Sequence, residues 1–237
     1  NEQGIESEIV SFTLQYPEFL FPGKTQLDES GKPPGEFQIT PLVNSLNPLS
    51  WRKTANYITN QNPDFVVFRY WLPFMAPALG SIAKKLKKRG VKVIAITDNV
   101  IPHESRIGDK QLTSYFLKQC SAYVAMSKSV LEDIKMFISN PVSAFITHPI
   151  YDIFGEAADK VESRIKLKLD AHDKVVLFFG FVRKYKGLDL LLEAFGDERI
   201  KSRNIKLIVA GEFYEDDQPY LDQIIKHGIE NNVILKK

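Results

Sequence analysis

Short apolar runs alternate with amphipathic segments along most of the chain. Runs rich in β-branched and aromatic residues are typical of buried strands, and apolar residues three and four apart are typical of one helix face. The pattern predicts strands over residues 8–14, 64–68, 91–97, 122–126, 143–147, 174–179, 206–210 and 232–235. It predicts one helix that begins at Ser50, another that ends at Gly90, and further helices over residues 111–120, 127–138, 157–167, 188–195 and 218–226. It leaves residues 15–49 irregular.

This alternation indicates the α/β class, with doubly wound parallel sheets covered by helices on both faces. Residues 148–155, which include Pro149 and Gly155, interrupt the rhythm and are typical of a linker. We therefore expect two Rossmann-like domains, residues 1–150 and 151–237. The second contains only three predicted strands, half of such a sheet with an exposed hydrophobic edge, so we expect it to be incomplete in this chain.

Composition narrows the class of protein. A net charge of +2 over 237 residues gives no reason to expect a nucleic-acid partner. The single cysteine, Cys120, excludes an intrachain disulfide and favours a cytoplasmic protein, and the longest apolar run is too short to cross a bilayer. The sequence has neither a cluster of metal-ligating residues nor a GxGxxG motif, so we expect no metal and no nicotinamide or flavin cofactor.

The strongest chemical signal is a basic turn between the strand over residues 174–179 and the helix that opens at Gly187. Arg183, Lys184 and Lys186 lie in this turn. Backbone N–H groups and the helix dipole favour an anion at such a place, and the cations strengthen the preference. The turn therefore predicts a phosphate or diphosphate site, the alternative being an ordinary solvated loop.

Polar and aromatic residues follow two strands of the first domain. Ligands bind at the carboxyl ends of strands in open α/β sheets, so Asp98 and His103 are candidates to hydrogen-bond a sugar or exchange a proton. The alternative is that residues 98–99 only shape a turn before Pro102. Tyr70 and Trp71 are candidates to stack on an acceptor sugar, the alternative being core packing.

A third group of residues is purely basic. Five cations lie close together near the end of one predicted helix: Lys84, Lys85, Lys87, Lys88 and Arg89. A solvated helix face explains them. The alternative is peripheral contact with an anionic membrane surface at the inner face of the membrane, where a lipid-linked acceptor would lie.

Five segments together carry a family resemblance: residues 16–24, 98–104, 148–151, 178–188 and 210–214. With these segments the chain resembles the group 1 (family 4) retaining glycosyltransferases, most closely a subset common in Bacteroidetes-type bacteria. The resemblance implies a GT-B-like pair of Rossmann-like domains, with a nucleotide-sugar donor held mainly by the C-terminal one. In the predicted reaction no metal is required, because the cations of the basic turn and the helix terminus do its work.

The resemblance assigns roles to individual residues. Lys186 matches the lysine that binds the donor diphosphate, and we carry the partner arginine's role to Arg183, because Phe181 occupies its usual place. Gly187 is part of the same motif. Gly211 and Glu212 match the loop near the nucleotide. A glycine-rich loop is expected before Asn1, and an acidic motif after Lys237.

The predicted function is transfer of a sugar from a nucleoside diphosphate sugar to a glycan or lipid-linked acceptor, with retention of configuration. In the family that the chain resembles, a histidine often follows the first-domain strand near the reaction centre. The matching position in this chain is Asp98. Two alternatives remain. One is a nucleotide-sugar epimerase of similar two-domain shape, for which His103 and Glu104 are the candidate acid/base residues. The other is a degenerate protein that binds sugar nucleotide or glycan without turnover.

Overall fold

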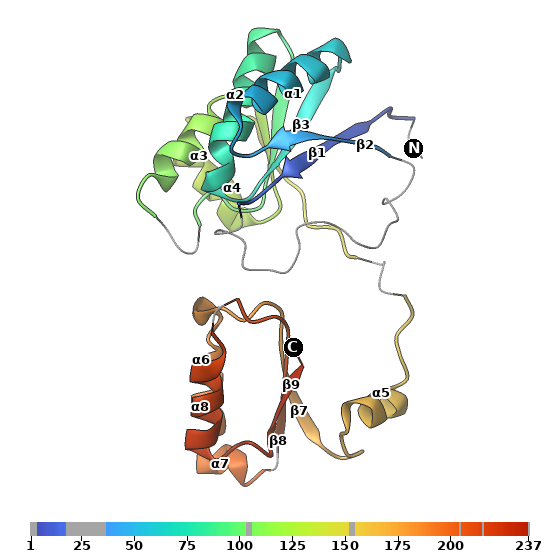
Figure 1. Ribbon diagram of the computed structural model, residues 1–237, viewed down its shortest axis with the longest axis vertical. Helices are drawn as coiled ribbons and strands as arrows, with labels where there is room; N and C mark the ends of the chain where they lie inside the picture. The colour runs from blue at the N-terminus through green and yellow to red at the C-terminus, as the bar shows by residue number, and fades with distance from the viewer. Residues whose placement is uncertain are drawn as a thin grey trace. The chain divides into compact units, whose positions relative to one another are not determined.

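The computed structural model describes residues 4–17, 37–102, 106–151, 155–203, 205–214 and 216–236. The chain divides into two compact units, Asn1–Tyr151 and Asp152–Lys237. In each unit parallel strands alternate with helices (Figure 1). The α/β class with parallel sheets is therefore confirmed.

The main sheet of the N-terminal unit has four parallel strands in the order of the sequence. They are β3 (Phe65–Tyr70), β4 (Lys92–Thr97), β5 (Ala122–Ala125) and β6 (Ser143–Phe145). The connections are η2 (Pro73–Met75), α2 (Ala76–Lys88), α3 (Asp109–Leu117) and α4 (Lys128–Lys135). Because all strands run the same way, their carboxyl ends meet at one edge, where Trp71 and Asp98 follow β3 and β4.

A strand that the sequence did not predict lies in the same unit. Residues 38–44 form β2 (Gln38–Asn44), which pairs in parallel with β1 (Glu8–Leu14) and corrects the expected irregular stretch. Pro41 in its middle hides the strand pattern, since proline cannot donate to a ladder. The pairing is reinforced by Glu8, whose carboxylate accepts hydrogen bonds from the hydroxyls of Thr40 and Tyr57.

The first helix, α1 (Pro48–Asn60), begins earlier than predicted. Its N-cap is Asn47, whose side-chain oxygen accepts from the Leu49 N–H at 2.9 Å. Ser50 lies inside the helix and donates its hydroxyl to the Asn47 carbonyl at 2.7 Å. The prediction was wrong here because serine and asparagine both cap helices well, and the proline at the first helical position favours Asn47.

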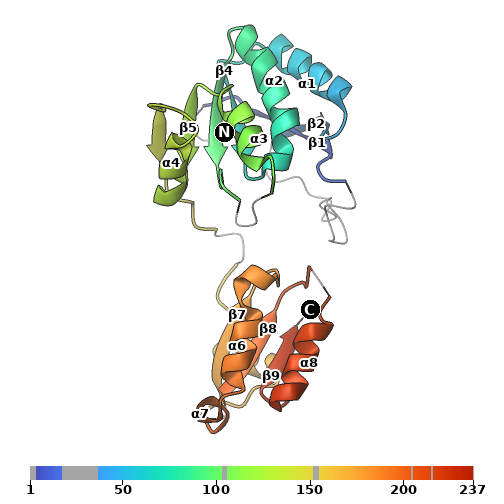
Figure 2. The same cartoon turned by 90° about the vertical axis from the view of Figure 1, so that its left-hand side faces the viewer.

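The C-terminal unit has a three-stranded parallel sheet in the order β7-β8-β9. Its elements are α5 (Lys160–Leu167), β7 (Lys174–Phe179), η3 (Lys184–Lys186), α6 (Leu188–Phe195), α7 (Glu198–Lys201), β8 (Ile205–Ala210), α8 (Gln218–His227) and β9 (Val233–Lys236). Helices α6 and α8 lie side by side on one face of the sheet (Figure 2). Leu188, Leu192 and Phe195 pack there with Leu207 and Val209.

The prediction that β7 is covered on both faces is wrong for the described residues. Leu177 and Phe179 are 59% and 78% exposed, and Val175 is also exposed. These residues alternate with Phe178, which packs against the core that includes α6 and α8, so they belong to the opposite face. Val176, on the same face as Phe178, is 39% exposed as well. Strand β7 is also an edge of the sheet. An apolar run shows that a strand is suited to burial, but it does not show that a neighbouring element covers it.

Candidate functional site

The basic turn of the C-terminal unit leads from the end of β7 to the start of α6. Gly180 follows the strand with φ +107°, and Gly187, at φ +73°, is the N-cap of α6. The intervening chain is held by its own backbone, with hydrogen bonds from Lys186 N to Arg183 O at 2.9 Å and from Gly187 N to Lys184 O at 3.1 Å. The turn thus fixes its backbone without using a charged side chain.

The cations of this turn are available to a ligand. Among the described residues, neither Arg183 nor Lys186 belongs to any ion pair. The Lys186 ammonium lies over the strand end, because a Cβ on Gly180 would be 3.3 Å from its Nζ. Gly180 therefore leaves room for this cation beside the N-terminus of α6, an arrangement suited to an anion.

A second loop, which follows β8, lies beside the basic turn. Gly180 N donates to Ala210 O at 3.0 Å, and Val182 N donates to Glu212 O at 2.8 Å. Gly211 has φ +148°, and a Cβ on it would lie 2.1 Å from Gly180 O. The structure therefore places Gly211 and Glu212 beside the turn. The carbonyls of Ala210 and Glu212 hold the two loops together, while the Glu212 side chain is exposed.

The sequence reasoning gave no role to Tyr214, which contacts Arg183. The guanidinium carbon of Arg183 lies 4.5 Å from the centroid of the Tyr214 ring. Phe181 meets the same ring edge-to-face, with centroids 4.7 Å apart and planes at 76°. An aromatic residue shortly after a glycine at a strand end was the available signal.

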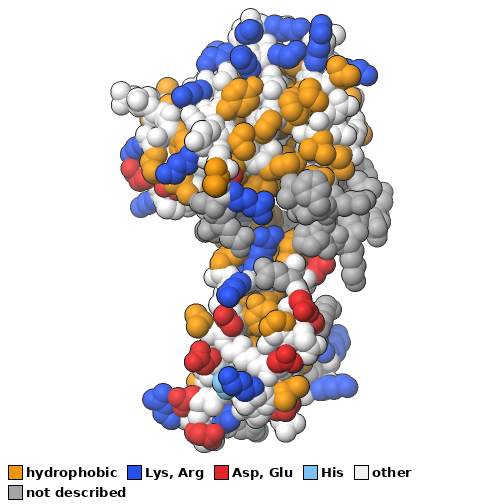
Figure 3. All heavy atoms as spheres, turned by 60° about the vertical axis from the view of Figure 1, so that its left-hand side comes forward, with side chains coloured by type: hydrophobic (Ala, Val, Ile, Leu, Met, Phe, Trp, Pro, Cys, Tyr) orange, Lys and Arg blue, Asp and Glu red, His pale blue; other side chains and the backbone are white. Residues whose placement is uncertain are grey.

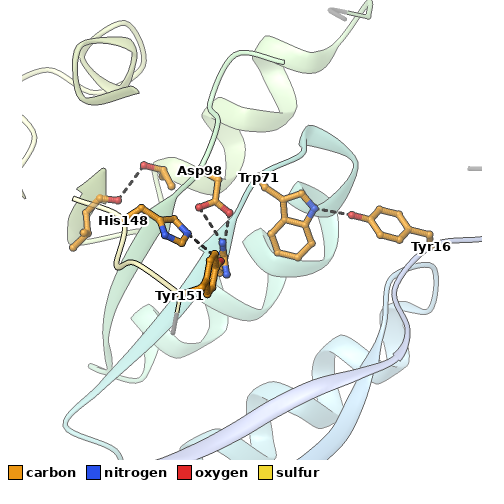
Figure 4. Close-up of polar contacts among 8 residues, drawn as sticks. Tyr16, Trp71, Asp98, His148 and Tyr151 are labelled. Atoms are coloured by element: carbon orange, nitrogen blue, oxygen red, sulfur yellow. Dashed lines mark hydrogen bonds and ion pairs between the residues drawn. The ribbon is translucent and has the colours of Figure 1, made fainter. Parts of the chain in front are cut away.

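In the N-terminal unit, Asp98 is paired with a residue that the sequence reasoning missed. Arg69 of β3 donates from Nε to Asp98 Oδ2 at 2.8 Å and from Nη2 to Oδ1 at 3.5 Å (Figure 4). The hydrogen bond to Asp98 is the main reason that the pKa of Arg69 is raised, with a smaller contribution from Tyr151. Asp98 is therefore the anionic half of an ion pair. A basic residue near the end of an apolar strand was the signal.

Two residues of the expected linker, His148 and Tyr151, lie close to the ion pair of Arg69 and Asp98. The Tyr151 hydroxyl is 3.2 Å from His148 Nε2, and the two ring centroids are 5.1 Å apart. Tyr151 also interacts with Arg69, since it contributes to the raised pKa of that residue. Figure 4 labels Tyr151, His148 and Asp98 in this part of the unit. His103, the other predicted proton-exchange residue, lies outside the described residues.

The two aromatic candidates of this unit have different surroundings. Trp71 is half-buried and donates from Nε1 to the Tyr16 hydroxyl at 2.6 Å (Figure 4). Tyr70 is fully buried, stacks on Phe116 at 4.6 Å and shares a hydrogen bond of 2.9 Å with Thr113. Burial raises the pKa of Tyr70. Its predicted role in acceptor binding is therefore wrong, because the strand extends two residues further than predicted and turns this ring into the core.

The basic cluster on α2 lies at the other end of the unit from Asp98. Figure 3 shows Lys and Arg side chains gathered at one end of the N-terminal unit. Arg89 donates to Asn56 and Thr59, and Lys87 donates to the Lys118 carbonyl, so two of the five cations stabilise helix packing. Lys84 and Lys88 are exposed. Contact of this cluster with a membrane stays a prediction.

No group of three or more His, Cys, Asp or Glu residues is arranged to hold a metal ion in the part of the chain that the structure describes. Within the same residues, every helix is too short or too polar to cross a membrane.

Comparison with known proteins connects the C-terminal unit to a family. Residues 159–237, about a third of the chain, match the family model described as "Glycosyl transferases group 1". The matched region contains the basic turn and the loop that follows β8. None of the curated proteins compared with the chain matches it.

Solved structures with low sequence identity share the fold. The chain is similar to Anabaena HepE in complex with UDP, with a TM-score of 0.61, 18% identity, and coverage of 84% of this chain and 55% of HepE. It is also similar to a mutant of S. aureus TarM, solved with fondaparinux, alpha-GlcNAc-glycerol and UDP. The TM-score is 0.52 and the identity 16%, over 79% of this chain and 36% of TarM. A third similar structure is UDP-GlcNAc 2-epimerase from Neisseria meningitidis bound to UDP-GlcNAc. The TM-score is 0.50 and the identity 11%, over 84% of this chain and 57% of the epimerase.

These likenesses show the fold alone, and they confirm the GT-B-like class expected from the sequence. The chain spans about half the length of HepE and of the epimerase.

Proposed function

We propose that the chain is part of a glycosyltransferase that moves a sugar from a nucleoside diphosphate sugar to a glycan or lipid-linked acceptor, with retention of configuration. The observation that carries the proposal is the pair of cations, Arg183 and Lys186, which form no ion pair among the described residues and lie beside the N-terminus of α6. The family match over residues 159–237 supports it, because the matched region contains this turn.

The basic turn is suited to stabilise a leaving diphosphate. In the proposed reaction the bond between the anomeric carbon and the phosphate oxygen breaks, and a bond from the acceptor oxygen to the same carbon forms. The acceptor proton passes to the leaving diphosphate, and attack on the face that the diphosphate leaves retains the configuration. Negative charge grows on the diphosphate as it departs, and preorganised cations stabilise that charge more in the transition state than in the ground state.

On the acceptor side, we assign Asp98 to hydrogen bonding. Its carboxylate is already fixed by Arg69 at 2.8 Å, so it is oriented to accept a hydrogen bond from a sugar hydroxyl. The half-buried ring of Trp71, held by Tyr16, supplies an apolar surface at the same strand edge. Aromatic surface beside fixed polar groups is the common composition of sugar sites.

The proposal is tested by changing Lys186 to alanine in the full-length protein. We expect turnover with a nucleoside diphosphate sugar to fall about 100-fold or more, the usual effect of removing one preorganised charge contact. The matched control is Lys226→Ala, which removes an exposed lysine from α8 in the same unit. Turnover that is unchanged in the Lys186→Ala protein, or lowered equally in the control, contradicts the assignment.

A nucleotide-sugar epimerase is the second candidate, since one solved structure of similar fold is such an enzyme. An epimerase alters the donor sugar without an acceptor, whereas a transferase needs one. Incubation of the full-length protein with UDP-GlcNAc alone, followed by chromatography of the sugar, separates the two. Binding of UDP measured by calorimetry, without any product in either assay, indicates instead a binding protein.

A further inference from the structure

We infer that Tyr214 is a positioning residue for Arg183, and that its ring holds the guanidinium in the orientation that binds a diphosphate. This inference rests on the proposed function and adds a residue that acts through another one. It starts from the 4.5 Å separation between the guanidinium carbon of Arg183 and the centroid of the Tyr214 ring.

The chemistry of the guanidinium group explains why this contact leaves the cation functional. The five N–H donors of arginine lie in the plane of the group and point outward from its edge. The Tyr214 ring attracts the cation through its π face and offers these donors no carboxylate or carbonyl acceptor. An ion pair with a carboxylate would occupy them, as Asp98 does for Arg69. Tyr214 thus restrains Arg183 and keeps its hydrogen-bonding edge available to phosphate oxygens.

The backbone holds the two residues in register. Tyr214 N donates to Val182 O at 3.2 Å, and Val182 N donates to Glu212 O at 2.8 Å. Val182 is buried and also pairs with Phe213 in a parallel bridge, so the residue directly before Arg183 is fixed to the loop that carries the ring. Phe181 supports the Tyr214 ring from a second direction at 4.7 Å. Both partners therefore start from anchored backbone.

Restraint matters because arginine has a long side chain with several rotatable bonds. An unrestrained arginine loses much of its rotamer freedom when it binds a ligand, and this loss opposes binding. A ring that holds the guanidinium before the ligand arrives removes part of that cost. We expect Tyr214→Leu to weaken the binding of inorganic pyrophosphate and of UDP about threefold to tenfold, the range of a partly exposed cation–π contact.

The experiment measures pyrophosphate and UDP dissociation constants by calorimetry on the full-length protein and its variants. Tyr214→Phe keeps the ring, so it should bind as the unmodified protein does. Phe213→Leu is the matched control, because it replaces the neighbouring ring of the same loop, which packs on Tyr220. In an Arg183→Ala background, Tyr214→Leu should cause no further loss, since the cation that the ring positions is gone.

Several results overturn the inference, and they differ from a failure of the proposed function. Equal losses from Tyr214→Phe and Tyr214→Leu assign the effect to the hydroxyl, and an equal loss from Phe213→Leu assigns it to loop packing. Additive losses from Tyr214→Leu and Arg183→Ala show independent action. If Arg183→Ala weakens binding and Tyr214→Leu does not, only the inference fails, whereas unchanged binding in both Arg183→Ala and Lys186→Ala removes the proposed diphosphate site itself.

A second variant protects the test against misfolding of Tyr214→Leu. Arg183→Lys keeps the positive charge but lacks the planar guanidinium group whose carbon lies 4.5 Å from the ring centroid. It should bind pyrophosphate more weakly than the unmodified protein does, because a lysine ammonium is not held by Tyr214 in the same way. Pyrophosphate binding by Arg183→Lys that equals that of the unmodified protein contradicts the inference, since charge alone then suffices.

Discussion

Replacing Gly211 with alanine should destabilise the C-terminal unit and separate the basic turn from the loop that follows β8. A Cβ at this position would lie 2.1 Å from Gly180 O and 2.7 Å from Gly180 C, both of them backbone atoms. Carbon and oxygen atoms in ordinary contact are well over 3 Å apart, so one loop must move by about 1 Å. Neither neighbour is a flexible side chain that can turn aside.

The magnitude follows from two contributions. A residue with a Cβ held in a backbone conformation such as φ +148° costs about 1–3 kcal/mol. Moving the loop also loosens the hydrogen bonds from Gly180 N and Val182 N, each worth about 1 kcal/mol net. We therefore expect the free energy of unfolding of the C-terminal unit to fall by about 3 kcal/mol or more. UDP binding should weaken as well, because Tyr214 moves with the loop.

The chain offers a matched control and two separate signals. Gly228 also has a positive φ, +61°, but a Cβ there would have no atom within 4 Å, so Gly228→Ala should cost only about 1–2 kcal/mol. Trp51 and Trp71 are the two tryptophans and both lie in the N-terminal unit, so fluorescence in urea follows that unit. Amide hydrogen exchange in β7, β8 and β9 follows the other.

The reasoning is refuted if Gly211→Ala costs no more than Gly228→Ala in the exchange of the C-terminal strands. It is also refuted if the tryptophan transition in urea shifts as much as that exchange, since the clash is confined to one unit.

Three further outcomes are expected. Tyr70→Phe should lower the free energy of unfolding of the N-terminal unit by about 1 kcal/mol in urea titrations, because the hydrogen bond with Thr113 is lost, and it should leave the acceptor KM unchanged. Cys120 should resist thiol reagents at pH 8 until the protein unfolds, since burial raises the pKa of its thiol to about 12. The carboxyl of Asp197 should titrate at about 2 by NMR, because the side-chain hydrogen bond from Arg199 lowers its pKa from 3.8, with a smaller contribution from the Arg199 backbone N–H. The stability that this carboxylate contributes is present above pH 4 and is lost as the pH falls through about 2, and it should be reduced in Arg199→Gln, which keeps only the backbone hydrogen bond.

The positions of regular elements could largely be predicted from local sequence. The strands at residues 8–14 and 174–179 and the helix at residues 188–195 have the bounds that periodicity predicted. Local patterns suffice there because an apolar run or a helical stripe sets the geometry of its own segment. The failures occur where local preferences compete: Pro41 concealed β2, and Asn47 capped α1 in place of Ser50.

The candidate site could be predicted only in part. The basic turn with Arg183 and Lys186 was evident from its place between a strand and a helix. The partners of these residues were not, because Tyr214 meets Arg183 only after β8 brings its loop beside the loop that follows β7. Arg69 and Asp98 likewise meet only because β3 and β4 are neighbours in parallel register.

The sequence by itself determined the alternation of strands and helices and the type of chemistry at a strand end, since both depend on residues close together in the chain. Only the tertiary structure decided which side chains are accessible and which are held. It buried Tyr70 against Phe116, placed Gly211 against Gly180 and paired Arg69 with Asp98. The physical reason is that burial and pairing depend on atoms far apart in the chain, whose approach no local pattern encodes.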